Sequence, residues 1–327
     1  MQYSYESAKE DYELNCDNTN PIKCKGVLEL NSIEEENFSP KSNNEKKEDE
    51  LTIKEESSIN LKISNYNYLN HIVDSSFNYA GNYENYVTNV LTSIIKLKNE
   101  IKDKENTEKK EEINNEILKN KIKNILNNSN KQILLLDLDE TLIHADFEGI
   151  FKNLNNYDTI INFNDNKSNY SIGIFLRPGI YDFLNILKEK FDIFIYTAST
   201  KEYADSIIKF LDPQNQIFKM TFYRENCINI NGQIFIKDLS LFENLDKIVI
   251  VDNSLYSFME HLSNGILINS FYGDKSDIEL YSVLNYLISF VCNCDDIRQM
   301  NEQFFNFKGI MNEIKGNMDY ENNQKVN

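Results

Sequence analysis

The chain has 327 residues, with 52 acidic and 34 basic side chains and a formal net charge of -18. This length allows one α/β domain with a tail, or two small domains. The negative charge argues against direct binding of nucleic acid through a basic surface. Five cysteines and three histidines show no zinc-ligand spacing,. The odd cysteine count and the lack of a signal peptide predict a reducing compartment, either the nucleus or the cytoplasm. No apolar run reaches membrane-spanning length.

The first 130 residues differ in composition from the rest. Residues 1–65 are rich in Glu, Lys, Asn and Ser and contain few apolar residues, which predicts a disordered acidic tail. In residues 66–129, apolar residues recur at helical spacing in two stretches, 87–101 and 113–126,. We expect two amphipathic helices that form a weakly packed extension or linker. The alternative is that residues 85–127 contact the following domain or a partner.

A folded domain is predicted over 130–305, followed by a loose polar tail at 306–327. The domain opens with four apolar residues, 133–136, which stop at Asp137 and Asp139. An uninterrupted apolar run of this length is typical of a strand buried on both faces of a parallel sheet. Ligands of such sheets bind at the carboxyl ends of the strands. The two carboxylates are therefore expected in a crevice, where they suit binding a hard cation or passing a phosphoryl group.

The middle of the domain contains further strands and helices. Two segments with alternating polarity, 157–163 and 170–176, flank a turn-forming cluster and predict a β-hairpin beside the first strand,. A second apolar strand, 192–197, ends in the hydroxyl of Thr197. Ser199 and Glu202 then follow at the spacing of a capping box, which predicts the start of a helix,.

The last part of the domain repeats the opening design. An Asn-Gly pair at 231–232 predicts the turn of a second hairpin, and Lys237 beyond it supplies a cation. A further apolar strand, 248–251, is followed by Asp252 and Asn253. Alternating strands and helices over about 170 residues predict a doubly wound, Rossmann-like α/β fold with small hairpin insertions.

Three strand ends thus carry polar groups that would meet in one crevice if the strands are parallel and adjacent. These residue types suit phosphoryl transfer to a carboxylate. A divalent metal and a lysine reduce the repulsion between an anionic nucleophile and a phosphate. Hard oxygen ligands from Asp137, Asp139, Asp252 and Asn253 suit Mg²⁺. The lack of histidine and cysteine in these motifs argues against zinc and against a cysteine phosphatase.

Six blocks occur in order: Asp137-Leu-Asp-Glu-Thr-Leu-Ile-His144, Leu176-Arg-Pro-Gly179, Thr197-Ala-Ser199, Phe222-Tyr-Arg-Glu-Asn-Cys227, Lys237-Asp-Leu-Ser240 and Val251-Asp-Asn-Ser254. Together they resemble the small C-terminal-domain phosphatases, the NLI-interacting-factor-like group of the haloacid dehalogenase superfamily. The resemblance covers about 133–300 and leaves out the first 130 residues.

The resemblance implies a haloacid-dehalogenase-like fold and a Mg²⁺-dependent protein serine/threonine phosphatase. Its substrate would be the tail of RNA polymerase II or another phosphoprotein. Asp137 would be the nucleophile, and Asp139 the general acid and base. The phosphoryl group would be bound by Thr197 and Lys237. The Mg²⁺ ligands would be the Asp137 side chain, the Asp139 main-chain carbonyl, Asn253 and, directly or through water, Asp252. The substrate peptide would be held by Phe147, Tyr203 and Arg224.

Several alternatives stay open. Phe147 and Tyr203 could be core aromatics, and Arg224 could pair with Glu225 or Glu243. The chain could be a non-catalytic relative of the mitochondrial import-receptor type, although that branch should carry a presequence and a membrane span. A phosphatase of the same group that acts on a signalling protein or a lipid-metabolism regulator is another possibility. Small-metabolite phosphatases usually carry a larger cap than the hairpin-sized insertion here, which favours protein substrates.

Overall fold

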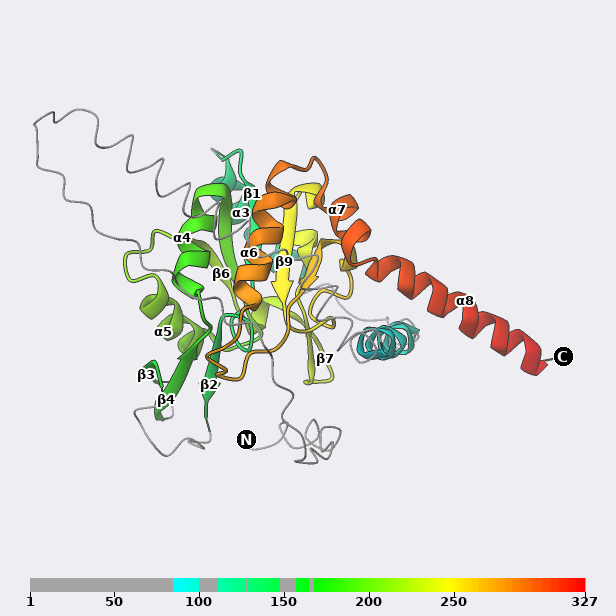
Figure 1. Ribbon diagram of the computed structural model, residues 1–327, viewed down its shortest axis with the longest axis horizontal. Helices are drawn as coiled ribbons and strands as arrows, with labels where there is room; N and C mark the ends of the chain where they lie inside the picture. Colours follow the sequence, from blue (N-terminus) through cyan, green and yellow to red (C-terminus); the bar gives the residue numbers. More distant parts are fainter. Residues whose placement is uncertain (1–84, 100–110, 128, 148–156, 165–167, 327) are drawn as a thin grey trace, which may run out of the picture. The chain divides into compact units, whose positions relative to one another are not determined.

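A parallel β-sheet of five strands forms the centre of the structure, a computed structural model (Figure 1). The structure describes residues 85–99, 111–127, 129–147, 157–164 and 168–326, all within one compact unit, Lys62–Asn327. Side by side, the strands are β10 (Gly265–Leu267), β9 (Ile248–Asp252), β1 (Gln132–Leu136), β5 (Phe191–Tyr196) and β6 (Phe218–Phe222). All neighbouring pairs are parallel, which confirms the predicted α/β class. The predicted disordered tail, 1–65, lies outside the described residues.

The strand order reverses at β1, the central strand. β5 and β6 follow it on one side, and β9 and β10 lie on the other. Leu136 is in register with Ile195 on one side and with Val251 on the other, so three strands end at the same level. Ligands of open α/β sheets bind at this kind of switch point. The residues that follow β1, β5 and β9 therefore lie at the same edge of the sheet.

The central strands are buried on both faces. Leu134, Leu135 and Leu136 have no exposed surface. Successive side chains of a strand point to opposite faces. Accordingly, Leu134 and Leu136 belong to one hydrophobic cluster and Leu135 to another. The sheet is thus the middle one of three layers.

One face of the sheet is covered by helices that lie within the predicted domain. They are α4 (Ile180–Lys190), α5 (Lys201–Leu211), α6 (Glu279–Ser289) and α7 (Ile297–Phe304). Each places apolar side chains in the cluster that contains Leu134 and Leu136. In α4, the buried residues Ile180, Phe183 and Leu187 recur at helical spacing,. Figure 1 shows α4 and α6 next to each other over the sheet.

The opposite face is covered by helices from outside the predicted domain. They are the helix over residues 85–99, α3 (Glu111–Leu126) and the start of α8 (Phe307–Val326). Leu91 and Ile94 have no exposed surface and lie in the same cluster as Leu135. The ammonium of Lys98 donates to the main-chain carbonyl of Met259 at 3.0 Å. The prediction of a weakly packed extension is therefore wrong for residues 85–99.

The connections on this second face contain no α-helix between residues 223 and 264, all of which the structure describes. The chain from β6 to β9, and from β9 to β10, forms short 3₁₀ turns and a hairpin instead. Such turns bury less apolar surface than a helix of several turns does. Helices from the flanking segments cover the remaining apolar surface of the sheet. This explains why their apolar residues belong to the same hydrophobic cluster as Leu135.

Two small β-structures are inserted into the domain. An antiparallel sheet has the order β2 (Ile143–Asp146), β4 (Asn169–Leu176) and β3 (Thr159–Asn164). The predicted hairpin of β3 and β4 is confirmed, and β2 is an additional strand. The second insertion is the hairpin of β7 (Ile228–Ile230) and β8 (Ile234–Ile236). At its turn, Asn231 and Gly232 have φ of 55° and 75°. Both values are left-handed, as an Asn-Gly hairpin turn requires.

The carboxyl-terminal residues also differ from the prediction. The polar tail predicted at 306–327 contains helix α8, Phe307–Val326, which the sequence analysis did not predict. Phe307 and Met311 lie one helical turn apart and are buried against the second face. Five apolar residues recur at helical spacing and pack on this face, a signal that the sequence analysis overlooked among the polar residues: Phe307, Ile310, Met311, Ile314 and Met318,. Among the described residues, no helix combines the length and apolar character that crossing a membrane requires.

Candidate active site

The candidate active site lies where β1 and β9 end next to each other. Asp137 directly follows β1, and Asp252 is the last residue of β9. The backbone N–H of Asp137 donates to the Val251 carbonyl at 3.0 Å, which extends the pairing of the two strands by one residue. The two carboxylate residues are only 6% and 1% exposed. Two buried negative charges in one place need a compensating cation.

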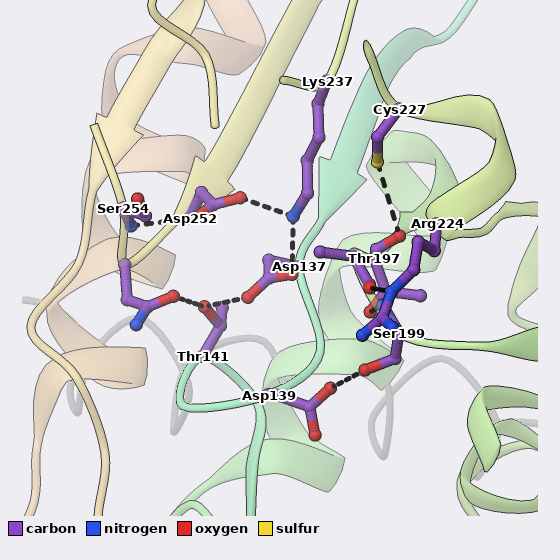
Figure 2. A network of polar contacts seen from close by, with 12 residues as sticks. Asp137, Asp139, Thr141, Thr197, Ser199, Arg224, Cys227, Lys237, Asp252 and Ser254 are labelled. Atoms are coloured by element: carbon purple, nitrogen blue, oxygen red, sulfur yellow. Dashed lines mark hydrogen bonds and ion pairs between the residues drawn. The ribbon is translucent and has the colours of Figure 1, made fainter. Parts of the chain in front are cut away.

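Lys237 supplies that cation. Its Nζ lies 2.5 Å from Asp137 Oδ1 and 2.5 Å from Asp252 Oδ2 (Figure 2). Burial lowers the pKa of Lys237, but the two carboxylates raise it by more, so the net shift is upward. Burial raises the pKa of Asp252, and Lys237 opposes that rise. One ammonium between two carboxylates leaves the site with excess negative charge.

The second oxygen of Asp137 is held by Thr141. Thr141 Oγ1 donates to Asp137 Oδ2 at 2.9 Å and lies 3.4 Å from Asn253 Oδ1. The amide nitrogen of Asn253 donates to Ser270 Oγ at 2.9 Å, so the amide oxygen stays on the side of Thr141. Lys237 and Thr141 together fix the orientation of the Asp137 carboxylate. Thr141 had no predicted role, although it ends the first motif.

Arg177 holds the loop after β1 in place, and sequence reasoning missed it. Its guanidinium donates to the main-chain carbonyls of Thr141 at 3.0 Å and Asn269 at 2.7 Å. It also forms a bidentate pair with Asp277, with both contacts at 2.8 Å. Such a fork of donors fixes geometry as well as charge. The signal was a charged residue between a predicted strand and a Pro-Gly turn, 178–179.

Asp139 is held by hydroxyl groups. Ser199 Oγ donates to Asp139 Oδ2 at 2.6 Å, and the Tyr203 hydroxyl donates to Asp139 Oδ1. Burial raises the pKa of Asp139 to about 7; Glu140 adds to the rise, and the two hydroxyl groups oppose it. A carboxyl group with a pKa near neutrality exchanges a proton readily, which suits a general acid and base.

Ser199 was expected to start a capping box. Helix α5 is instead capped by Thr200, which makes no side-chain hydrogen bond. The hydroxyl of Ser199 points to Asp139, as Figure 2 shows. The capping-box prediction is therefore wrong, and the Ser-x-x-Glu spacing concealed a residue of the site. The overlooked signal was the position of Ser199 two residues after a strand-end hydroxyl, Thr197.

Two further predicted residues lie beside this pair. Thr197 directly follows β5 and is buried, and its Oγ1 accepts a hydrogen bond from the Ser199 N–H at 3.0 Å. Arg224 is exposed, and its Nε donates to the Ala198 carbonyl at 2.6 Å. Its guanidinium carbon lies 5.0 Å from the centre of the Phe235 ring. Among the described residues, Arg224 forms no ion pair with the two glutamates considered above.

Four aromatic rings form a row whose second ring, Tyr203, contacts Asp139 and whose two end rings are exposed. We call it the aromatic row: Phe147, Tyr203, Phe163 and Tyr170. Tyr203 is 4% exposed, and its ring centre lies 5.4 Å from that of Phe147 and 5.6 Å from that of Phe163. The rings of Phe163 and Tyr170 stack at 5.0 Å. Phe147 is 63% exposed, so it is no core residue, whereas Tyr203 is.

The oxygen atoms of the candidate active site fit a hard divalent cation. Asp137, Asp252 and Asn253 offer carboxylate and amide oxygens, and the main-chain carbonyl of Asp139 is a further oxygen. Lys237 leaves one of the two carboxylate charges unbalanced. Among the described residues, no three His, Cys, Asp or Glu side chains are grouped to hold a metal. A cation here would rely on the amide, the main chain and water, as Mg²⁺ sites commonly do.

Comparison with known proteins gave a family match. The model described as "NLI interacting factor-like phosphatase" matches residues 132–298. The "Probable C-terminal domain small phosphatase" of Dictyostelium discoideum is 38% identical over 166 residues, 50% of this chain and 52% of that protein. The "CTD nuclear envelope phosphatase 1B" of Danio rerio is 34% identical over 167 residues, 50% of this chain and 68% of that protein. A solved structure of the fission yeast RNA polymerase II CTD phosphatase Fcp1 aligns with a TM-score of 0.41 at 20% identity, over 57% of this chain and 53% of its own.

The chain spans only 52% of the Dictyostelium discoideum protein and 48% of a further relative, from Schizosaccharomyces pombe. The family match covers just over half of this chain and contains both aspartates of the first motif, Lys237 and the Asp252-Asn253 pair. The predicted resemblance is thereby confirmed: the chain belongs to the NLI interacting factor-like phosphatase family.

Proposed function

We propose that this chain is a Mg²⁺-dependent protein serine/threonine phosphatase that works through an aspartyl-phosphate on Asp137. The position of Lys237 carries the proposal, because its ammonium lies 2.5 Å from both Asp137 and Asp252. A cation there lowers the repulsion that an anionic nucleophile meets as it approaches a phosphate. Family membership supports the reaction class.

In the first step, a carboxylate oxygen of Asp137 attacks phosphorus, and the bond from phosphorus to the seryl or threonyl oxygen breaks. Asp139 gives its proton to that oxygen, and the free hydroxyl group leaves. Thr141 keeps the nucleophile oriented through its hydrogen bond at 2.9 Å. Lys237 and the hydroxyl of Thr197 would bind the phosphoryl oxygens, which carry the negative charge of the transition state.

In the second step, water attacks phosphorus, and the bond between phosphorus and Asp137 breaks to release inorganic phosphate. Asp139, now ionised, takes the proton of the attacking water. One carboxyl group thus serves as acid and then as base. A pKa of about 7 suits this alternation, because both forms are populated near neutral pH,.

Mg²⁺ is the proposed cofactor. Its ligands would be the Asp137 side chain, the Asp139 main-chain carbonyl and Asn253, with Asp252 bound directly or through water. When bound, the ion stabilises the charge that develops on the transferring phosphoryl group. The protein prepares this site through Ser270, which accepts a hydrogen bond from the Asn253 amide at 2.9 Å and so orients the amide oxygen,.

A phosphorylated serine or threonine within a peptide is the proposed substrate. Phe147, the more exposed end of the aromatic row, offers a ring for apolar contact with a peptide,. The exposed guanidinium of Arg224 donates to the Ala198 carbonyl and so offers a charge beside the loop that carries Ser199. The Dictyostelium discoideum relative is named a C-terminal domain phosphatase, and for this chain we propose the C-terminal domain of RNA polymerase II as the substrate. A signalling protein or a lipid-metabolism regulator is the alternative substrate. A nuclear or cytoplasmic location fits either substrate, and imaging of a tagged chain tests the location.

The direct test is hydrolysis of p-nitrophenyl phosphate by the wild type and by Asp137→Asn. We expect Mg²⁺-dependent activity in the wild type, loss of activity in EDTA, and no activity in the variant, because the amide is no nucleophile. Asp182→Asn is the matched control, since Asp182 is exposed on α4. Full activity of Asp137→Asn defeats the covalent mechanism. A folded wild type that binds phosphopeptides without hydrolysing them favours the binding-module alternative.

A phosphopeptide panel tests the substrate. It compares serine positions of the polymerase-tail heptad with unrelated phosphoserine and phosphothreonine peptides by kcat/KM. Selective hydrolysis of heptad peptides supports the polymerase tail. Equal rates across the panel point to another phosphoprotein, chosen by contacts outside the immediate phosphosite.

A further inference from the structure

Asp139 accepts one hydrogen bond on each carboxylate oxygen. Ser199 Oγ lies 2.6 Å from Oδ2, and the Tyr203 hydroxyl contacts Oδ1. Both donors come from the loop and first turn of α5, whose helix spans Lys201–Leu211. The two contacts prevent rotation of the carboxyl group about its own axis. Its direction is therefore set by the start of one helix.

This arrangement leaves the carboxyl group able to carry a proton. Each carboxylate oxygen has two lone pairs, and each hydroxyl donor occupies one of them. One lone pair per oxygen remains for a proton that arrives or leaves. The two hydroxyl groups can thus fix the geometry of Asp139 without blocking proton transfer.

Tyr203 itself has little freedom to move. Its residue is 4% exposed, and its ring packs against Phe147 and Phe163. Rings at such separations interact favourably in tilted and edge-to-face arrangements. A buried, packed ring keeps its hydroxyl at a fixed position on Asp139. Tyr203 therefore offers little surface to a substrate peptide, in contrast to the role implied by the family resemblance.

We propose that Tyr203 and Ser199 are positioning residues that aim the Asp139 carboxyl group at the leaving oxygen. The inference rests on the proposed function, in which Asp139 protonates that oxygen as its bond to phosphorus breaks. A general acid contributes most when the leaving group is a poor one that needs its proton. The two hydroxyl groups consequently matter in proportion to the basicity of the leaving oxygen.

Two aryl phosphates of similar shape separate this role from peptide binding. p-Nitrophenolate is stable enough to leave without a proton, whereas the phenolate of phenyl phosphate is more basic. For Tyr203→Phe and Ser199→Ala, we expect kcat/KM with phenyl phosphate to fall about ten-fold or more, the range for a hydrogen bond to a charged group. With p-nitrophenyl phosphate we expect a change within about three-fold. A phosphoserine peptide should behave like phenyl phosphate, because an alkoxide is a still poorer leaving group.

Tyr223→Phe is the matched control. The Tyr223 hydroxyl donates to Asp205 Oδ1 at 2.6 Å. It therefore also holds a carboxylate, but Asp205 lies on α5 and outside the candidate active site. We expect this variant to change kcat/KM for both aryl phosphates by the same factor. Thermal unfolding of each variant shows whether the fold is intact. Ser199→Ala, on a half-buried loop residue, keeps the test decisive if Tyr203→Phe does not fold.

A double-mutant cycle asks whether the hydroxyl group acts through Asp139. In an Asp139→Asn background, we expect Tyr203→Phe to cause no further selective loss with phenyl phosphate. An undiminished selective loss in that background overturns the inference. So does an equal loss with both aryl phosphates, or a loss confined to the peptide, which would make Tyr203 a substrate contact only. These results leave the proposed function standing, whereas an inactive wild type or an active Asp137→Asn variant defeats that function itself.

Discussion

The two aspartates of the first motif are two residues apart in sequence but lie in contrasting surroundings. Asp137 is held by the ammonium of Lys237 and the hydroxyl of Thr141. Asp139 is held by the hydroxyl groups of Ser199 and Tyr203. A cation at 2.5 Å balances the charge of the first carboxylate. The second has only neutral donors, and burial raises its pKa to about 7.

This difference shows how the fold assigns separate roles to two identical side chains. A carboxylate beside a cation suits a nucleophile, and a carboxyl group with a raised pKa suits proton transfer. The chain turns sharply directly after Asp139, because Glu140 has a left-handed φ of 56°. That conformation is uncommon outside glycine and turns the chain sharply. Its backbone carbonyl accepts a hydrogen bond from Phe271 at 2.8 Å, which holds the turn.

The largest effect should come from removing the cation beside Asp137. In Lys237→Met, two buried carboxylates lose their partner, and we expect the free energy of unfolding to fall by about 3–5 kcal/mol. Urea unfolding in EDTA measures it. Lys201→Met is the control, because its ion pair with Asp205 is half-exposed and should contribute at most about 1 kcal/mol,. An equal loss of unfolding free energy in both variants would contradict the proposal that Lys237 compensates the two buried carboxylates.

The pH dependence tests the surroundings of Asp139. Its folded pKa is raised to about 7, so the proton-bearing form is present below that pH and is lost above it. We expect kcat/KM for a phosphoserine peptide to fall up to about ten-fold per pH unit above pH 7, because the first step needs the proton. Asp139→Asn should be slower throughout and should lack this decline. An unchanged decline in Asp139→Asn assigns it to another group.

A smaller effect, of different character, is expected from Thr141→Val. The variant loses the hydrogen bond to Asp137 Oδ2 at 2.9 Å, and kcat/KM should fall about ten-fold. Because the nucleophile is affected and the acid is not, phenyl and p-nitrophenyl phosphate should lose equally. Thr92→Val makes the same change on the 85–99 helix, where the hydroxyl donates to the Thr88 carbonyl, and should leave the rate unchanged. A loss in Thr141→Val that depends on the leaving group would contradict the assignment of different roles to Asp137 and Asp139.

The smallest effect concerns the thiol of Cys227, which lies 3.7 Å from the Thr197 carbonyl (Figure 2). Burial raises the pKa of Cys227 to about 12. The reactive thiolate is therefore scarce at pH 8. We expect iodoacetamide to label Cys227 at least about ten-fold more slowly in the native chain than in urea, as followed by mass spectrometry of the peptides. Fast native labelling would mean that the site contains a third reactive group.

The central part of the site could be predicted from the sequence because its signals are local. Apolar runs that stop at Asp137, Thr197 and Asp252 identify parallel strands and the groups at their ends. The geometry of such sheets then brings those groups together. Ser199 was misassigned because its spacing to Glu202 is that of a capping box, and only the three-dimensional structure shows where its hydroxyl points. Arg177 was missed because its partners are distant in sequence: Asn269 and Asp277.

Which segments cover the second face of the sheet could not be decided from the sequence. An amphipathic pattern shows that a helix has an apolar side but not what that side contacts. Leu91 and Ile94 are buried against the sheet because no α-helix lies in the connections on that face within the described residues. Which face of the sheet lacks a covering helix depends on the spatial order of the strands, which the sequence does not show directly. The helices also lie outside the family match, 132–298, so the resemblance did not extend to them.

The most direct test of the account is a burst experiment with Asp139→Asn and p-nitrophenyl phosphate. The nitrophenolate leaves without help from an acid, whereas breakdown of the aspartyl-phosphate needs Asp139 as base. We predict a burst of p-nitrophenol close to the enzyme concentration, followed by slow turnover, with a hydroxylamine-labile phosphate on Asp137. A linear time course with no phosphate on Asp137, or with phosphate on another residue, would contradict the division of roles between the two aspartates.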